Sequence, residues 1–73
     1  LKAGYLERRL PELALPVLIV HGRRDPIPYW SAEQTAAMIP DVSLQPIEDC
    51  GHFPWLERPG ELRRHIAAFL AAR

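Results

Sequence analysis

The fold is decided by residues 16–25, whose sequence is PVLIVHGRRD. The proline pushes the residue before it toward an extended conformation, which prepares the chain for a strand. Residues 17–20 are four consecutive apolar residues, three of them β-branched. Such a run is typical of a strand covered on both faces within a parallel sheet. The sequence therefore predicts a buried strand that ends at Gly22, with a charged loop directly behind it.

Helical patterns lie on both sides of this strand. Upstream, leucines recur at helical spacing until Pro11, so we expect a short helix that ends or kinks just before the proline. Downstream, two prolines exclude a helix from residues 25–28. Ser31 and Gln34 form a capping-box pattern, which predicts a helix that begins at Ser31 and stops at Pro40. Its inner face is expected to carry Ala32, Ala36 and Ile39.

A second strand and a last helix follow. Residues 42–47 alternate like a strand, and Pro46 indicates an edge or a strand end. Pro59 suits the first position of a helix, along which Leu62, Ile66, Phe69 and Leu70 form an apolar stripe. The predicted order is helix, strand, helix, strand, helix. Two strands joined by a helix form a βαβ unit with parallel, right-handed pairing.

This order is typical of the α/β class, as part of a doubly wound, mainly parallel sheet. Two strands are too few to complete such a sheet, because the apolar strand at 17–20 would normally have a neighbour on each side. Alone, the chain would leave a sheet edge and apolar surface in water. We therefore expect residues 1–73 to form one segment of a single domain, incomplete by itself.

The composition limits the classes of function. Nine basic and nine acidic side chains balance, so nothing favours nucleic acid or an anionic membrane as a partner. The single cysteine cannot form an internal disulfide, which fits a reducing compartment, and we expect a cytoplasmic location. We expect neither a signal peptide nor a membrane span, because residues 1–73 contain no long apolar run. Its start at Leu1 suggests a processed or excised segment.

The residues that carry chemistry follow the two predicted strands. Asp25 lies just beyond the first strand, and His52 lies in the turn of residues 49–55, DCGHFPW, beyond the second. Because adjacent parallel strands end at the same edge of a sheet, both loops should meet there. A carboxylate at that position can accept the imidazole N–H, fix its tautomer and stabilise the imidazolium that forms during catalysis. We predict that His52 is a general base and Asp25 its orienter.

Structural roles compete with these assignments. Asp25 could serve only an Asx turn before Pro26, and Asp49 is an alternative acid. His21 is expected to bond locally, His65 to pair with Glu61 on the helix surface, and Cys50 to pack as a small apolar residue. A metal site from His21, Asp25 and His52 matches no known ligand spacing, and we predict neither metal nor cofactor. Three aromatic residues could line a substrate pocket or the core: Trp30, Phe53 and Trp55.

Residues 14–73 resemble the C-terminal segment of an α/β-hydrolase. The resemblance rests on residues 16–25 and on residues 47–59, IEDCGHFPWLERP. It implies that Asp25 is the acid and His52 the base of a catalytic triad, in the family's chain order. The tail after His52 is similar to that of proline-iminopeptidase-type serine aminopeptidases, although epoxide hydrolases, dehalogenases, esterases and carbon–carbon bond hydrolases share much of it.

The sequence departs from this family in one essential respect. It contains no Gly-x-Ser-x-Gly elbow, and neither Ser31 nor Ser43 resembles a nucleophile. The resemblance implies that the nucleophile lies N-terminal of this segment, on a companion chain of the same enzyme. We expect hydrolysis of ester or amide bonds in a small molecule or peptide, with an aminopeptidase as the narrower prediction. The rival hypothesis is a non-catalytic interaction module that binds a partner through its sheet edge.

Overall fold

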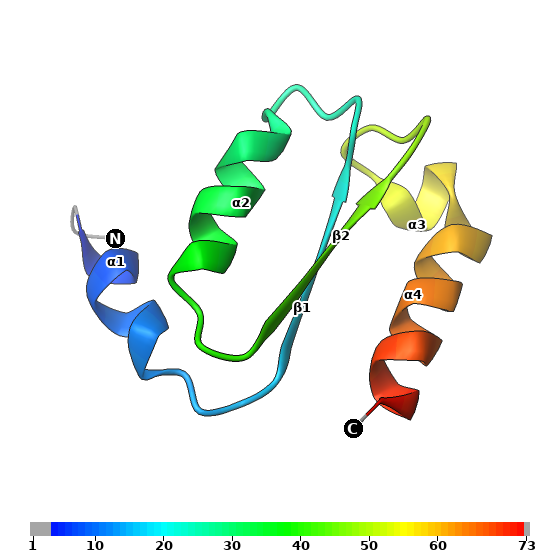
Figure 1. Ribbon diagram of the computed structural model, residues 1–73. Helices are drawn as coiled ribbons and strands as arrows, with labels where there is room; N and C mark the ends of the chain where they lie inside the picture. The colour runs from blue at the N-terminus through cyan, green and yellow to red at the C-terminus, as the bar shows by residue number, and fades with distance from the viewer. Residues whose placement is uncertain (1–3, 73) are drawn as a thin grey trace.

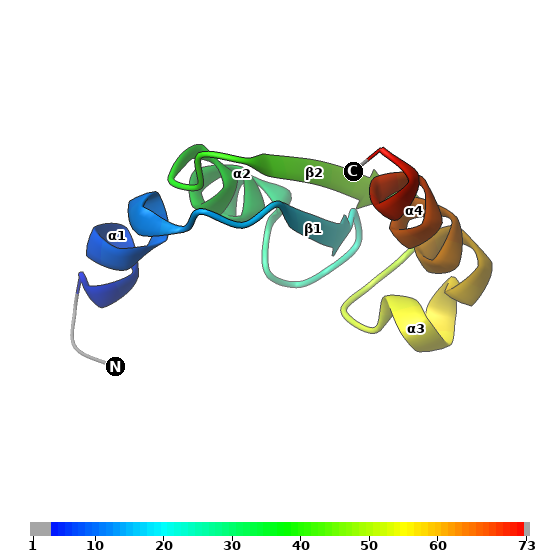
Figure 2. The ribbon, with the colours of Figure 1, turned by 90° about the horizontal axis from the view of Figure 1, so that it is seen from below.

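The computed structural model describes residues 4–72 of the chain, which form a thin slab (Figures 1 and 2). The elements, in chain order, are α1 (Tyr5–Arg9), the 3-10 helix η1 (Leu10–Glu12), β1 (Val17–Gly22), α2 (Tyr29–Ala37), β2 (Val42–Ile47), α3 (Pro54–Glu57) and α4 (Pro59–Ala71). The predicted alternation of helices and strands is confirmed. Two short helices, η1 and α3, were not predicted.

The two strands pair in parallel, from Val17 opposite Val42 to Gly22 opposite Ile47. Figure 1 shows α2 on one side of the strands and α4, with α3, on the other. Both α2 and α4 contact both strands. This arrangement confirms the predicted α/β class and the parallel pairing of a strand–helix–strand unit. It also places the ends of β1 and β2 next to each other, where the predicted site residues follow.

The first helix ends as its proline predicts. The α-helical hydrogen bonding of α1 stops at Arg9, and the chain tightens into η1, which contains Pro11 near its start. Leu13 then adopts extended φ and ψ angles of −65° and 123°. The chain is therefore already extended when it approaches β1.

The predicted start of α2 was wrong. The helix begins at Tyr29, two residues before Ser31, and no side chain caps it. Pro28 holds the N-cap position with an extended backbone, and the Ser31 amide donates to the Pro28 carbonyl within the first turn. Tyr29 is fixed by tertiary contacts, with the Arg23 guanidinium 4.2 Å from its ring centre and the His21 ring against its edge. These contacts override the local capping signal.

The buried core is small for a chain of this length. Its buried apolar residues, among those that the structure describes, are Ala32, Ile39, Ile47 and Cys50. Leu15, Leu56 and Leu70 are 68%, 72% and 65% exposed. The apolar stripe of α4 is only partly covered, because Leu62 and Phe69 are half-buried whereas Ile66 is exposed. Across residues 4–72 the sheet contains β1 and β2 alone, so the chain forms a partial domain, as predicted.

No helix within residues 4–72 has the length and apolar character needed to cross a membrane.

Candidate active site

The loop that carries Asp25 is held by backbone hydrogen bonds at the end of β1. The amide of Asp25 donates to the carbonyl of Gly22 over 3.1 Å. The amides of Arg23 and Arg24 donate to the carbonyls of Ile47 and Cys50, over 3.0 and 2.8 Å. The loop after β1 is therefore fastened directly to the turn after β2.

The turn that carries His52 lies directly over the end of β1. Asp49 has a φ of 52°, a left-handed conformation that Asp tolerates better than most residues. Cys50 is fully buried, and the backbone of Cys50 and Gly51 packs against Gly22 so closely that a Cβ there would lie 2.2 Å from the Gly51 carbonyl oxygen. Only glycine fits at position 22 without moving the histidine turn.

These two loops bring the predicted pair together. Nδ1 of His52 lies 2.9 Å from Oδ2 of Asp25. An ionised carboxylate can only accept, so Nδ1–H donates and leaves Nε2 as the acceptor on the other side of the ring. The Asp25 side chain is 6% exposed and that of His52 is 53% exposed. The carboxylate is thus enclosed, while the imidazole is open to a reacting group.

Both oxygens of Asp25 are used. Oδ1 accepts the amide of Ile27 over 2.8 Å while Oδ2 accepts His52, so the Asx turn and the orientation of the imidazole are compatible roles. Burial acts to raise the pKa of Asp25, but the hydrogen bonds from His52 and from the Ile27 amide outweigh it and lower the pKa below its ordinary value. The carboxylate is held in the ionised form that an imidazolium needs beside it.

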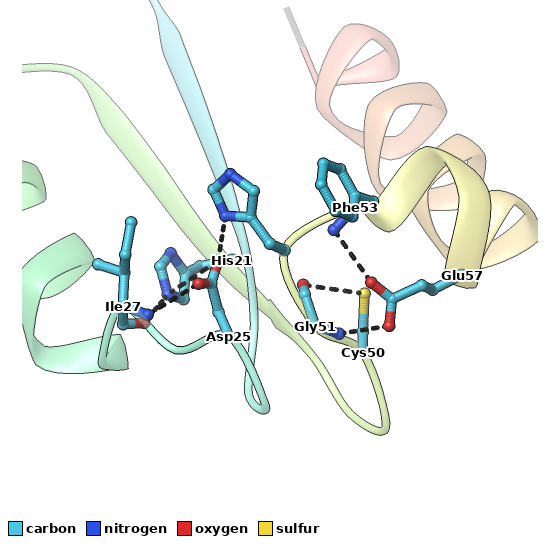
Figure 3. Close-up of polar contacts among 8 residues, drawn as sticks. His21, Asp25, Ile27, Cys50, Gly51, Phe53 and Glu57 are labelled. Atoms are coloured by element: carbon cyan, nitrogen blue, oxygen red, sulfur yellow. Dashed lines mark hydrogen bonds and ion pairs between the residues drawn. The ribbon is translucent and has the colours of Figure 1, made fainter.

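The alternative residues have other partners. His21 bonds locally, as expected: its Nε2 lies 2.8 Å from the Ile27 carbonyl oxygen, to which it donates, and 3.8 Å from Oδ2 of Asp25 (Figure 3). Asp49, the alternative acid, forms ion pairs with Arg24 and Arg58 at 2.9 and 3.7 Å. Its carboxylate therefore pairs with arginines, whereas His52 pairs with Asp25. The described part of the chain contains no cluster of three or more His, Cys, Asp or Glu side chains able to hold a metal.

Cys50 is a packing residue, as predicted. Its side chain has no exposed surface, and burial raises the pKa of its thiol. The thiol contacts the carbonyl oxygen of Gly51 at 3.6 Å. On the last helix, Glu61 pairs with Arg64, and His65 is half-buried, so the predicted surface pair of Glu61 and His65 was wrong.

A hollow of about 370 Å³ opens beside the His52–Asp25 pair. Its apolar wall includes Val20, Ile27, Trp55 and Leu62. Phe53 packs its ring edge-on against His52 and Trp55, at 5.1 and 5.5 Å between ring centres. Of the three aromatic residues proposed for a pocket, Trp55 lines this hollow, Phe53 contacts the imidazole, and Trp30 is an exposed residue of α2.

One residue of the site was not predicted. The carboxylate of Glu57 accepts the amides on both sides of His52, from Gly51 over 2.8 Å and from Phe53 over 3.0 Å (Figure 3). The sequence carries little sign of this, because the partners of Glu57 are backbone groups and α3 is only four residues long.

Comparison with known proteins identifies the family. Residues 2–65 match the Alpha/beta hydrolase family. The chain belongs to the α/β-hydrolase family. This result confirms the resemblance that the strand and histidine-turn motifs carry.

Three relatives show how much of an α/β-hydrolase the chain represents. It is 39% identical to the pimeloyl-[acyl-carrier protein] methyl ester esterase of Aromatoleum aromaticum over 51 residues, which are 68% of this chain and 20% of that protein. The crystal structure of a membrane phospholipase A, a bacterial virulence factor, superposes on this chain with a TM-score of 0.85 and 37% sequence identity, and the match covers 92% of this chain and 22% of that one. The structure of a thermophilic esterase from Thermogutta terrifontis superposes with a TM-score of 0.86 and 33% sequence identity. This match covers 90% of the present chain and 25% of the esterase. The chain therefore spans about a fifth to a quarter of these α/β-hydrolases.

Proposed function

We propose that Asp25 and His52 are the acid and base of a Ser-His-Asp triad that hydrolyses carboxylic esters. The observation that carries this proposal is the 2.9 Å contact between Nδ1 of His52 and Oδ2 of Asp25. The carboxylate is enclosed and fixed by a second hydrogen bond, whereas the imidazole is half-exposed. This is the arrangement in which an acid orients a base toward a nucleophile.

The chemistry follows from the free nitrogen of His52. Nε2 takes the proton of a serine hydroxyl as the serine oxygen attacks the ester carbonyl carbon. Asp25 stabilises the imidazolium that forms. The imidazolium then gives the proton to the alcohol oxygen as the ester C–O bond breaks, and the acyl group stays bonded to the serine. His52 then takes a proton from water as the water oxygen attacks the acyl carbon, and it returns that proton to the serine oxygen as the acyl–serine bond breaks, which releases the carboxylic acid and the free serine. No metal or redox group takes part in these steps.

The nucleophile in this proposal lies outside the 73 residues, on an N-terminal companion chain of the same enzyme. Ser31 lies in α2, and the Ser43 hydroxyl, near the start of β2, accepts a hydrogen bond from Gln45. Asp25 and His52 lie near the opposite end of β2, beyond Ile47. The outer edge of β1 is unpaired within residues 4–72, and a further parallel strand there would end at the same edge of the sheet as the His52–Asp25 pair.

The names of the relatives support an ester over an amide. The curated relative is a methyl ester esterase, and one of the structural relatives is an esterase. The aminopeptidase of proline-iminopeptidase type is the narrower sequence prediction, and its support is the tail after His52 alone. Epoxide hydrolases, dehalogenases and carbon–carbon bond hydrolases remain the alternatives of the same fold, and they differ in the nucleophile or the substrate.

A substrate panel tests this function. The chain is isolated from its source with the polypeptides that accompany it and offered p-nitrophenyl esters and amino-acid p-nitroanilides. Turnover of the esters is expected, and His52→Ala should abolish it. His65→Ala, in α4, is the matched control and should leave turnover unchanged. Faster turnover of the anilides would favour the aminopeptidase. Turnover of neither class would contradict the ester hydrolase and favour either the other hydrolases of this fold or the interaction module.

A further inference from the structure

The carboxylate of Glu57 accepts hydrogen bonds from the backbone amides of Gly51 and Phe53, the residues before and after His52. Oε1 of Glu57 accepts the amide of Gly51 over 2.8 Å, and Oε2 accepts the amide of Phe53 over 3.0 Å. Figure 3 shows the carboxylate reaching both residues from the end of α3. The backbone between those two amide nitrogens comprises Gly51 and His52, and the two hydrogen bonds restrict how it can turn.

The two amide donors, from Gly51 and Phe53, suit an ionised carboxylate at position 57, because each carboxylate oxygen accepts one of them. The hydrogen bonds from the Gly51 and Phe53 amides lower the pKa of Glu57, despite an opposing effect of burial. A Cβ on Gly51 would lie 3.1 Å from both carboxylate oxygens, a distance at which Glu57 would have to move. The glycine before His52 therefore has a specific use, because it lets the carboxylate approach the turn.

A neighbouring residue fastens the other end of the same turn. Nε of Arg58 donates to the carbonyl oxygen of Asp49 over 3.1 Å, and its Nη2 lies 3.7 Å from the Asp49 carboxylate. Glu57 and Arg58 are consecutive at the junction of α3 and α4. This junction therefore holds the backbone of the turn at Asp49, Gly51 and Phe53, while the His52 side chain bonds to Asp25 on the neighbouring loop.

We propose that Glu57 is a positioning residue, which sets the orientation of the His52 imidazole toward Asp25 for the ester hydrolysis proposed above. This inference rests on that proposed function, because orientation matters for rate only if His52 is the base. Glu57 touches no reacting atom and acts through His52 alone. A misplacement of about 1 Å can cost on the order of 100-fold in rate.

Glu57→Gln tests the proposal with minimal change in shape. The amide side chain keeps one acceptor oxygen but turns an N–H group toward the other backbone amide, so one of the two hydrogen bonds is lost. We expect kcat for the ester to fall by about 10- to 100-fold with KM nearly unchanged, because the substrate pocket is retained. The downfield proton NMR signal of Nδ1–H in His52 should broaden or disappear. Glu61→Gln, at an exposed position that pairs with Arg64, is the matched control and should change neither readout.

The two variants distinguish failure of the positioning role of Glu57 from failure of the proposed ester hydrolysis. If His52→Ala is inactive while Glu57→Gln keeps both full kcat and the Nδ1–H signal, the positioning role is wrong and the proposed function stands. If His52→Ala retains turnover, the proposed function fails, and the NMR signal in Glu57→Gln still decides whether Glu57 orients the ring. If Glu57→Gln does not fold, Glu57→Asp replaces it; this side chain keeps the charge but is too short to reach both amides, and an unchanged kcat and signal would overturn the inference.

Discussion

Replacing Gly22 with alanine perturbs the closest backbone contact of the site. The added Cβ would lie 2.2 Å from the carbonyl oxygen of Gly51 and 2.3 Å from that of Cys50. Ordinary contact begins at 3.4 Å, so the turn must recede from β1 by about 1.2 Å. Both neighbours are backbone atoms, which cannot rotate away as the end of a side chain can. The turn that carries His52 would thus move away from the loop that carries Asp25.

The expected effect has two parts. Forcing an extra carbon atom into a packed region costs about 1–3 kcal/mol of unfolding free energy. Moving a catalytic group by about 1 Å lowers the rate on the order of 100-fold. Gly22→Ala should therefore lower kcat for p-nitrophenyl esters about 100-fold and shift the urea midpoint downward, measured on the natural protein with its accompanying polypeptides.

A second glycine provides the control. Gly60 lies in the first turn of α4, and a Cβ there would meet nothing within 4 Å. Gly60→Ala should leave kcat unchanged and, because alanine favours helix, stabilise the protein by up to ~1 kcal/mol. The reasoning is refuted if Gly22→Ala retains the kcat and the urea midpoint of Gly60→Ala.

Three further predictions concern single side chains. Asp25→Asn should lower kcat by about 10³- to 10⁴-fold, because the amide no longer stabilises the imidazolium and can favour the wrong tautomer. Steady-state kinetics measure this loss, and an unchanged circular dichroism spectrum shows that the variant is folded. A loss in kcat below tenfold would count against the acid role. The pKa of Asp25 is lowered from its ordinary 3.8, so its contribution to stability is present above that value and is lost as the pH falls through the lower folded-state pKa. Urea midpoints from roughly pH 5 to 2 should therefore fall more steeply for the natural sequence than for Asp25→Asn, and parallel curves would contradict this. The buried thiol of Cys50, whose pKa burial raises, should react with a disulfide reagent only as fast as the protein opens; immediate reaction under native conditions would show that the turn is not closed over it.

The strand order and the contact between His52 and Asp25 could be predicted from the sequence because their signals are local and strong. An unbroken apolar run with three β-branched residues predicts a parallel strand, and β1 covers it. The run was also expected to be buried, but residues 17–21 are only half-buried, because the sheet within residues 4–72 has no further strand beside β1. Parallel strands end at the same edge, so residues just beyond β1 and β2 had to meet. The 2.9 Å contact between His52 and Asp25 is the result of that topology.

The remaining features depend on contacts that a sequence pattern does not mark. The start of α2 at Tyr29 is set by Arg23 and His21, which contact the Tyr29 ring from another element. Glu57 acts on backbone amides, which every residue possesses, so no partner residue type reveals it. Gly22 suggested only the end of a strand, whereas the structure shows a second backbone packed against it.

Labelling with a fluorophosphonate tests the central claim most directly. The natural protein is treated with the reagent, digested, and the modified serine located by mass spectrometry, alongside the His52→Ala variant. The account predicts one labelled serine, outside residues 1–73, and no labelling in His52→Ala because no base remains to activate that serine. Labelling of Ser31 or Ser43, or undiminished labelling in His52→Ala, would contradict it.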